Sequence, residues 1–533
     1  MEGKIYLSIT NTIVGMGHEP KRREFLAAVG TAGIVGVAGC SGGGDDDGGN
    51  DTGGGGGDTT EAGGGGEATD TAASGGGETT EGGMETTEGG METTGEGTEM
   101  TEEGTEMTEE GTEMTEEGTE TTTTGSSGTS IEGTGSSNLL VVIGYPESGI
   151  QLFRDYYSMA SGEENILVPD GLREGSLPGD VGNDMNNVLG TAPAAGGPNQ
   201  EAFSSLYQDE YGEPPGVFTS QSYDSVAILT LANAAAGENS GPAVKEQMRR
   251  IANPGGDEYG PENFVDAVEA AANGDDINYQ GASSATNFDE NGDPASAAYA
   301  VWEFGDDGTE TMTTRNFESD SPEGAGPAAD SAPGGMGREA MVGILLPQTG
   351  DLASVGGPMI QAAELPAMQV NNADLDFSVS TQVQDTQTLP DPGTQAANTL
   401  VQSGVPAVCG SASSGVNVPV STSVFIPNQT VGCSPSSTAL SVTNLEDDDF
   451  IFRTAPSDSL QGRVMAQIAS EDLETDTAAT LYVNNDYGQQ LSERFAEVYQ
   501  DEFGGSVESQ NAFNIGESSY SSVLDNALSS LEG

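Results

Sequence analysis

The sequence predicts an α/β fold with two lobes, each built on a parallel sheet that is covered by helices on both faces. From Asn138 onward, short apolar runs of strand length alternate with stretches of helical periodicity. Most of these runs lack an alternating polar face, as expected of strands buried on both sides. The alternating part spans about 390 residues, more than one such sheet usually holds, so two lobes are expected.

The first block of this pattern runs from 138 to 317. It opens with a predicted strand, "NLLVVIGY", and a predicted helix, "SGIQLFRDYYSMA". Further strands are expected at "ENILVPDG" and "NVLGTAPA", and helices at "NQEAFSSLYQDEYG" and "SQSYDSVAILTLANAAA". In the last stretch Tyr223, Ala227, Thr230 and Leu231 recur at helical spacing, which predicts one long helix.

The second block, 341–533, repeats the alternation. Its expected strands are "MVGILLP", "DFSVSTQVQD", "VPAVCGS", "FIPNQTVGC" and "AATLYVNN", most of them followed by a helix. The blocks are separated by 318–340, which is rich in Pro, Gly, Ala and Ser and lacks apolar periodicity. We expect this stretch to be a linker. A flexible chain of that length spans roughly 25 Å, enough to connect two points across one face of a domain.

The charge of the chain limits its partners. Eighty-six acidic residues stand against 14 basic ones, a net charge of −72, and lysine occurs only at positions 4, 21 and 245. Such a chain repels nucleic acid and anionic membrane surfaces, which are therefore poor partners. Many carboxylates with few lysines suit molar salt, where the Debye length shrinks to about 3 Å, so we expect a halophilic host.

The first 39 residues have the pattern of an export signal. Lys21-Arg22-Arg23-Glu24-Phe25-Leu26 is a twin-arginine pattern, and the small and apolar run after it is too short to span a bilayer. The run ends in Val37-Ala38-Gly39-Cys40, which is typical of a lipoprotein cleavage box, so Cys40 is expected to be lipidated. The alternative, a structural cysteine, finds no apolar core in the flanking sequence. The fifteen residues before Met16 are unusual for a signal and indicate a start codon placed too early.

Residues 40–137 are expected to be a disordered acidic tether. They consist mostly of Gly, Asp, Glu, Thr and Ser and contain the seven-residue repeat GTEMTEE, beginning at 97, 104 and 111. A seven-residue period raises a coiled coil, but one methionine per repeat supplies too little apolar surface for a seam. The segment is better explained as a solvated, self-repelling spacer.

The two blocks together resemble the branched-chain amino-acid binding proteins of ABC importers, which have the type I periplasmic-binding fold. The stretches that carry the resemblance are "VGILLPQTGDLASVG", "GSASSGVNVPVS", "CSPSSTALS", "FIFRTAPSDSLQG", "TLYVNNDYGQQL", "VVIGYPESG", "LVPDGL" and "FTSQSYDSVAIL". The resemblance implies two doubly wound parallel sheets joined by hinge strands. The block 341–533 is similar to the first half of that family's domain, and 138–317 is similar to its second half.

The reversed order of the halves predicts a circular permutation. The chain ends in a helix, "SSYSSVLDNALSSLEG", and the first block begins with a strand, so joining Gly533 to Asn138 restores one continuous domain. The alternative is a fragment of a recombined tandem gene whose halves need a partner chain. On the permuted reading the lobes divide the chain as follows: lobe 2 holds 138–195 and 456–533, lobe 1 holds 196–297 and 341–455, and the hinge-return strands are 298–317.

The family resemblance also assigns the groups that hold an amino-acid ligand. Hydroxyls and backbone N–H groups at the ends of parallel strands suit a carboxylate, and the matched loops place Ser414, Ser436 and Thr438 on it, with Ser413 close by. As isolated features these serines and the threonine would be helix caps and turns.

Asp170, at the end of the strand in "LVPDGL", matches the family's acidic partner of the ligand ammonium. Tyr145, Tyr487 and Phe218 are expected to form aromatic walls of the same site. As core residues the tyrosines would need a buried partner for each hydroxyl. Val355 stands where some family members carry an aromatic residue, which leaves the preferred side-chain size open.

Cys409 and Cys433 end neighbouring predicted strands. Their Cα atoms could lie within the roughly 4.4–6.8 Å that a disulfide requires, and an extracellular location permits one. Two buried thiols are the alternative.

The function implied by the resemblance is extracellular binding of a small amino acid of the branched-chain type. Two lobes would close on the ligand without cofactor or metal, and the closed form would dock on the permease subunits of an ABC importer. The protein would lie on the outer face of the cytoplasmic membrane, exported by the twin-arginine route and anchored through a lipid on Cys40. Other readings are a sensor ectodomain, a binding protein for short amides, urea or another small polar ligand, and a non-functional rearranged copy.

An enzyme is not expected. The single histidine, His18, lies in the expected signal, which leaves no Ser-His or Cys-His pair and no histidine metal ligand in the mature chain. No phosphate-binding GxxxxGK[ST] loop occurs either. An adhesive surface-layer protein is raised by the Thr-rich acidic stalk, but the β-sandwich repeats typical of such proteins are missing from the pattern.

Overall fold

The computed structural model describes residues 131, 133–160, 162–305, 308–318 and 324–532. The expected signal at 1–39, the expected lipidation site Cys40 and nearly all of the expected tether lie outside these residues. In the described part of the chain, no helix combines the length and the apolar character needed to cross a membrane.

The larger of the two main sheets has seven strands and draws on both blocks. In spatial order these are β14 (Ser506–Phe513), β13 (Thr477–Val483), β1 (Asn138–Ile143), β2 (Asn165–Val168), β3 (Val188–Pro193), β6 (Ser296–Gly305) and β7 (Gly308–Glu318). The first five are parallel, and β6 and β7 are antiparallel additions at one edge. The predicted parallel sheet of this lobe is therefore confirmed, with two antiparallel strands that form its edge.

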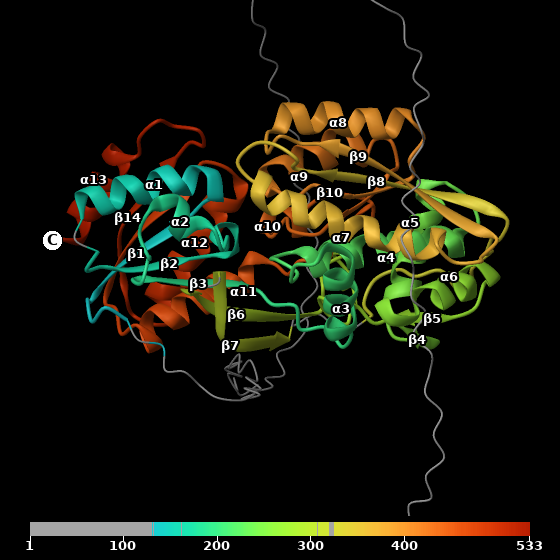
Figure 1. The fold of residues 1–533 in the computed structure, drawn as a ribbon, viewed down its shortest axis with the longest axis horizontal. Coiled ribbons are helices and arrows are strands. Elements are labelled where there is room, and N and C mark those ends of the chain that lie inside the picture. Colours follow the sequence, from blue (N-terminus) through green and yellow to red (C-terminus); the bar gives the residue numbers. More distant parts are fainter. Residues whose placement is uncertain (1–130, 132, 161, 306–307, 319–323, 533) are drawn as a thin grey trace, which may run out of the picture. The chain divides into compact units, whose positions relative to one another are not determined.

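The helices of this sheet are supplied by both blocks as well. Two of them, α1 (Pro146–Met159) and α13 (Ser521–Leu531), contact each other, as do α11 (Asp458–Gln467) and α12 (Asp486–Asp501). The short α2 (Leu177–Val181) lies beside α1. Figure 1 shows α13 and α1 side by side although they are almost four hundred residues apart.

The second main sheet has five parallel strands: β12 (Ile451–Arg453), β11 (Val431–Ser434), β10 (Ala407–Gly410), β8 (Arg338–Leu346) and β9 (Phe377–Asp385). Side chains of β8 alternate between two cores: Ile344 and Leu346 belong to one, and Leu345 to the other. Because both sides of the strand are buried, the run reads as continuously apolar rather than alternating. This is why "MVGILLP" could be recognised as a buried strand.

Helices from both blocks cover the five-stranded sheet. On one side lie α4 (Thr219–Ala236) and α7 (Ala353–Asn371), and on the other α8 (Pro390–Gln402) and α9 (Ser414–Val420) (Figure 1). Every residue of α4 is buried, and Gly237, at φ 72°, ends it in the left-handed conformation that glycine adopts without strain. The remaining helices are α3 (Gln200–Tyr211), α5 (Gly241–Ala252), α6 (Phe264–Asn273) and α10 (Leu440–Thr443), and β4 (Asp257–Tyr259) pairs with β5 (Ile277–Tyr279).

The two blocks meet within the seven-stranded sheet. Strand β1 pairs in parallel with β13 from Asn138 opposite Thr477 to Ile143 opposite Tyr482. The side-chain amide of Asn138 donates to the carbonyl oxygen of Leu531 at 3.1 Å. The final helix α13 thus lies directly beside the first strand of the first block.

The segment between the blocks follows the surface of the helices α4 and α5. The Ala329 N–H donates to the Glu246 carbonyl (3.0 Å), and the Gly334 N–H donates to the Ala235 carbonyl (2.8 Å). Strand β8 begins at Arg338, three residues before the predicted strand, because Arg338 to Ala340 pair with Phe377 to Val379 of β9. Polar residues at a strand end are not detected by apolar periodicity.

Besides the segment between β7 and β8, three connections join the two main sheets, and a buried ion pair links two of these three. They leave β3 after Pro193, enter β6 before Ser296 and leave β12 after Arg453. Asp293, just before β6, accepts from the Arg453 guanidinium at 2.5–2.6 Å, and Arg453 is fully buried. The hinge-return strands were expected at 298–317; these residues belong to β6 and β7 at the edge of the seven-stranded sheet, and the crossing lies immediately before them.

Candidate ligand-binding site

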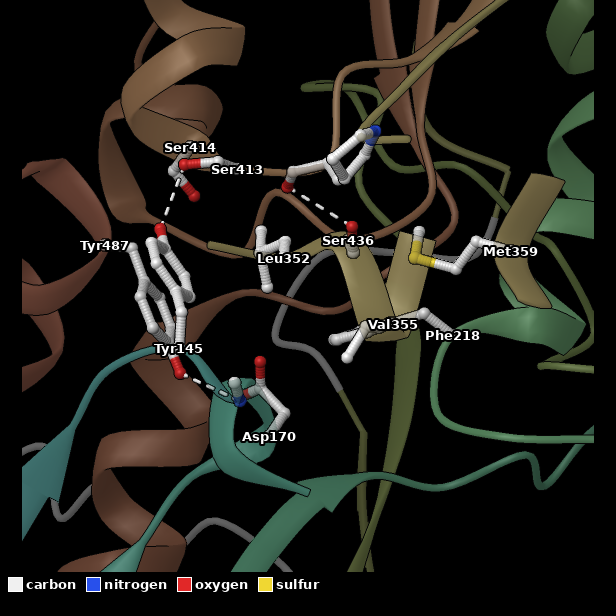
Figure 2. A pocket seen from close by; sticks show the side chains of 13 residues that line it. Tyr145, Asp170, Phe218, Leu352, Val355, Met359, Ser413, Ser414, Ser436 and Tyr487 are labelled. Carbon is white, nitrogen blue, oxygen red and sulfur yellow. Dashed lines mark hydrogen bonds between the residues drawn. The ribbon is translucent and has the colours of Figure 1, made fainter. Parts of the chain in front are cut away.

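A cavity lies where the carboxyl ends of the two main sheets face each other. Such ends are where parallel sheets place their ligands. Figure 2 shows the residues around it, which come from both sheets. The lining residues are Tyr145, Asp170, Gly171, Phe218, Pro347, Leu352, Val355, Met359, Ala412, Ser413, Ser414, Ser436 and Tyr487. All residues predicted for the site are in this set except Thr438.

The serine loops form the wall on the side of the five-stranded sheet. Ser413 and Ser414 begin α9 directly after β10, and Ser436 follows β11, the next strand. The Ser436 hydroxyl donates to the Ala412 carbonyl at 3.2 Å, which links the two loops. A set of hydroxyls on adjacent strand ends is therefore present, as predicted.

Thr438 lies behind this wall rather than on it. Its side chain is 1 % exposed, and its hydroxyl has no hydrogen-bond partner among the described residues. The Thr438 carbonyl accepts from the N–H of Asp458 at 2.8 Å, so the residue connects the serine loops to α11.

Two stacked tyrosines form the opposite wall. The rings of Tyr145, just after β1, and Tyr487, in the first turn of α12, are 5.8 Å apart and nearly parallel, at 9°. The Tyr145 hydroxyl lies 2.9 Å from the Ser413 hydroxyl and accepts from the Asn485 side-chain amide at 2.9 Å. Burial raises the pKa of both tyrosines well above the ordinary value, so both hydroxyls stay neutral and can donate.

Asp170 closes the floor between these walls. It begins a short 3-10 helix, Asp170–Leu172, right after β2, and is 3 % exposed. Its Oδ1 has no hydrogen-bond partner among the described residues. Burial raises the pKa of Asp170 to about 6, partly offset by hydrogen bonds from Gln461 and Tyr487. The carboxylate therefore presents an uncompensated oxygen, which an ammonium group would stabilise.

Gly171, the next residue, keeps the tyrosine close to this floor. Its N–H donates to the Tyr487 hydroxyl at 3.3 Å. A Cβ at this position would lie 2.4 Å from the Gly144 carbonyl oxygen and 3.0 Å from the Tyr487 hydroxyl. Only glycine leaves room for this approach.

Asp458 is a second buried carboxylate near the cavity that sequence reasoning missed. It is fully buried, and neither of its oxygens has a partner in the described part of the chain. Burial, reinforced by the charge of Asp170, raises its pKa well above the ordinary value. Arg453 opposes this effect only weakly, since its guanidinium is committed to Asp293.

No local signal separates Asp458 from an ordinary helix start. It follows Ser457, whose hydroxyl accepts from the Ser459 N–H as an N-cap, and acidic residues are common in the first turn of a helix. Only its burial beside Asp170 distinguishes it, and burial here depends on residues from the other block.

The remaining wall is apolar. Leu352, Val355 and Met359, at the start of α7, line this wall. Phe218, the residue that precedes α4, lines it as well. This surface suits the hydrocarbon part of a ligand. Val355, the residue that left the preferred size of the ligand's side chain open in the sequence, is part of this wall.

Cys409 and Cys433 lie directly opposite each other on β10 and β11, as expected for neighbouring strand ends. Both are free, fully buried thiols, so the disulfide alternative is not realised. Burial raises the pKa of both thiols. They are inert members of the core.

Comparison with known proteins identifies a family match in the second block and relatives that match part of the chain. Residues 339–530 match the family described as periplasmic binding protein. The chain is 30 % identical over 158 residues to Leu/Ile/Val-binding protein homolog 3 of Brucella melitensis, covering 29 % of this chain and 42 % of the relative. It is 28 % identical over 192 residues to Leu/Ile/Val-binding protein homolog 1 of Brucella abortus, covering 35 % of this chain and 50 % of the relative. The chain thus spans about half the length of the curated relatives that it matches.

Solved structures give alignments of similar extent. A leucine-binding protein from Thermotoga maritima aligns with a TM-score of 0.33 and 23 % identity over 36 % of this chain and 53 % of its own. A branched-chain amino acid transporter substrate-binding protein from Streptococcus pneumoniae, solved with isoleucine, aligns with a TM-score of 0.32 and 24 % identity over the same shares.

The strand order, the cavity between the two main sheets and the family match to residues 339–530 lead to one conclusion: this is an α/β protein of the type I periplasmic-binding fold whose second block is similar to periplasmic binding proteins.

Proposed function

We propose that this protein binds a small amino acid, of the branched-chain type, and delivers it to an ABC importer by closing two lobes around it. The observation that carries the proposal is that one cavity contains groups suited to a carboxylate on one side and a group suited to an ammonium on the other. Serine hydroxyls line it from the five-stranded side, and the uncompensated Asp170 lines it from the seven-stranded side. An α-amino acid has a carboxylate for the first and an ammonium for the second.

The remaining walls are consistent with this ligand. The stacked tyrosines supply neutral hydroxyl donors, and the apolar wall from Leu352 to Met359 suits an aliphatic side chain. Proteins that match part of this chain are named as Leu/Ile/Val-binding proteins, which supports the same ligand class.

Closure would depend on contacts that cross between the lobes. Besides the Tyr145–Ser413 hydrogen bond, Ser148 at the start of α1 donates its hydroxyl to Asp351 at 2.7 Å and its N–H to the same carboxylate at 3.3 Å. Opening the cleft breaks these bonds, and a ligand that contacts both lobes shifts the balance toward the closed form. The described structure corresponds to a closed arrangement.

The order of the blocks is explained by a circular permutation. The β1–β13 pairing and the contact between Asn138 and Leu531 support it, since they place the two blocks in one sheet in the order the family's domain requires. A sequential alignment to an unpermuted relative would then follow only one block at a time, consistent with matches to about half of each relative. A chain that joins Gly533 to Asn138 and is opened within 319–337 would bind the same ligand with the same affinity.

We further propose that the protein acts outside the cell of a halophilic host. Export by the twin-arginine route and a lipid on Cys40 would place it at the membrane, with 40–137 as its spacer. Mass spectrometry of the membrane fraction would test this, with a Cys40→Ser variant released to the medium as the expected result.

Thermal unfolding of the protein in molar salt, with a panel of ligands, tests the function. Leucine, isoleucine or valine should raise the melting temperature, since a ligand that binds only the folded state stabilises it. If short amides or urea raise the melting temperature and no amino acid does, the ligand is an amide or urea and the proposed amino-acid ligand is wrong.

A further inference from the structure

A second, larger hollow adjoins the cavity on its apolar side. It is open to solvent and is lined from both lobes. Phe218 and Val355 line both hollows. The apolar wall of the inner cavity is therefore also the boundary to this outer groove, and Val355 offers a smaller barrier there than an aromatic residue would.

Arg173 lines the outer groove from the seven-stranded side. Its Nη2 donates to the Thr311 hydroxyl at 3.0 Å and its Nε to the Thr309 hydroxyl at 3.4 Å. The guanidinium carbon lies 5.7 Å from the centre of the Trp302 ring. These neutral contacts fix the direction of the side chain without neutralising its charge.

Arg173 has no anionic partner among the described residues, a property that it shares there with Arg154 and Arg338. Six other arginines of the described chain form ion pairs with carboxylates (Arg249, Arg250, Arg315, Arg453, Arg463 and Arg494), whereas Arg173 forms none there. Glu174 and Glu213 also line the groove, but neither is paired with it, and a Glu174 oxygen accepts from the Ser176 N–H at 3.2 Å. Burial lowers the pKa of Arg173 to about 10, which leaves it charged at neutral pH.

We propose that this groove is an outer subsite for an anionic group at the far end of the ligand's side chain. The inference rests on the proposed binding of a small amino acid and extends the ligand class beyond the branched-chain type, to an amino acid whose methylene chain passes Phe218 and Val355 and ends in a carboxylate on Arg173. A planar guanidinium binds a carboxylate through two parallel hydrogen bonds. Such a ligand would contact serines of one lobe and Arg173 of the other, and so would favour closure.

The test compares ligands that differ only in that terminal charge. Calorimetric titration in molar salt would pair glutamate with glutamine, and 2-aminoadipate with its side-chain amide. In the wild-type protein one acid should bind roughly tenfold more tightly than its amide, or better. Equal affinity for acid and amide in both pairs would overturn the inference, and this comparison needs no variant.

Variants assign the preference to Arg173. Arg173→Gln should abolish the difference between acid and amide while leaving the affinity for the amide within about twofold. Arg154→Gln, at an exposed arginine of α1, should leave the preference intact. A preference that survives Arg173→Gln would overturn the assignment. If leucine binds and the acids bind no better than their amides, only this inference fails; if no amino acid binds at all, the proposed function fails with it.

Discussion

The hydroxyl of Tyr145 lies 2.9 Å from the hydroxyl of Ser413, and this contact joins the end of a strand in one sheet to the serine loop of the other. The two residues are 268 positions apart in the chain and belong to different blocks. Their contact places the predicted hydroxyl wall and the predicted aromatic wall around one cavity. Opening of the cleft would separate Tyr145 from Ser413 and break this contact.

Removing this hydroxyl should weaken ligand binding modestly. A neutral hydrogen bond contributes about 0.5–1.5 kcal/mol, so Tyr145→Phe should reduce affinity by up to about tenfold. The ring stack with Tyr487 would remain. Calorimetry provides the measurement, and Tyr520→Phe, which alters a tyrosine outside the cavity, is the matched control. Equal losses in both variants would show that the effect is not local.

Asp170→Asn should separate stability from binding. Burial raises the pKa of Asp170 from 3.8 to about 6, so the folded protein favours the protonated form. The stability that this group contributes is complete below about pH 4 and is lost as pH rises through 6. The asparagine variant should therefore have a free energy of unfolding about 1–3 kcal/mol greater than wild type at pH 8, and similar to wild type at pH 4.

The same variant should lose most of its affinity for an amino acid, by about a hundredfold, because the ammonium no longer meets a charge. Chemical unfolding at the two pH values and calorimetry provide the measurements. A variant that is less stable than wild type at pH 8 would contradict the buried-charge explanation.

The affinity for an amino acid should fall as the pH is lowered below about 6. The ligand ammonium stays protonated throughout, whereas Asp170 takes up a proton below about pH 6. Binding should be constant above pH 7 and fall by up to tenfold per unit below 6. Asp351, whose pKa burial also raises to about 6 against the hydrogen bonds from Ser148, should add a smaller decrease. Titrations from pH 8 to 5 would show this, and in Asp170→Asn only the Asp351 component should remain. An affinity that rises toward pH 5 would be the contrary result.

The ion pair at the connections between the sheets should be far more important for stability than a surface pair. Arg453→Met leaves the buried Asp293 without a counter-charge, which should cost about 3–5 kcal/mol. Arg463→Met removes a pair with Glu502 that is exposed on both sides and should cost about 1 kcal/mol or less. Urea unfolding in constant salt compares them. Similar losses in both would argue against a special role for the buried pair.

The sequence was most informative where burial leaves a local pattern. The apolar run in β8 and the helical spacing in α4, a helix that is buried on every side, predicted both elements from local sequence. Asp170 and the serines of the loops after β10 and β11 could be assigned because each follows a recognisable strand and matches a family stretch.

The features of the site that the sequence did not predict depend on contacts between distant segments. Asp458 has the appearance of a helix start, and only the proximity of Asp170 gives it a different character. Thr438 was expected on the cavity wall but lies one layer behind it, because its carbonyl is bound to the N–H of Asp458. The outer groove at Arg173 is made by α3, α4, α7 and the edge strands β6 and β7, which no single stretch of sequence brings together.

The central claim is that a single amino acid bridges the two lobes, with its carboxylate on the serine loops and its ammonium on Asp170. Calorimetric titration of the tightest-binding amino acid against wild type, Ser414→Ala and Asp170→Asn tests it most directly, with one substitution on each lobe. We expect a single site per chain and weaker binding in both variants. Wild-type affinity in either variant, with the fold intact, would contradict it.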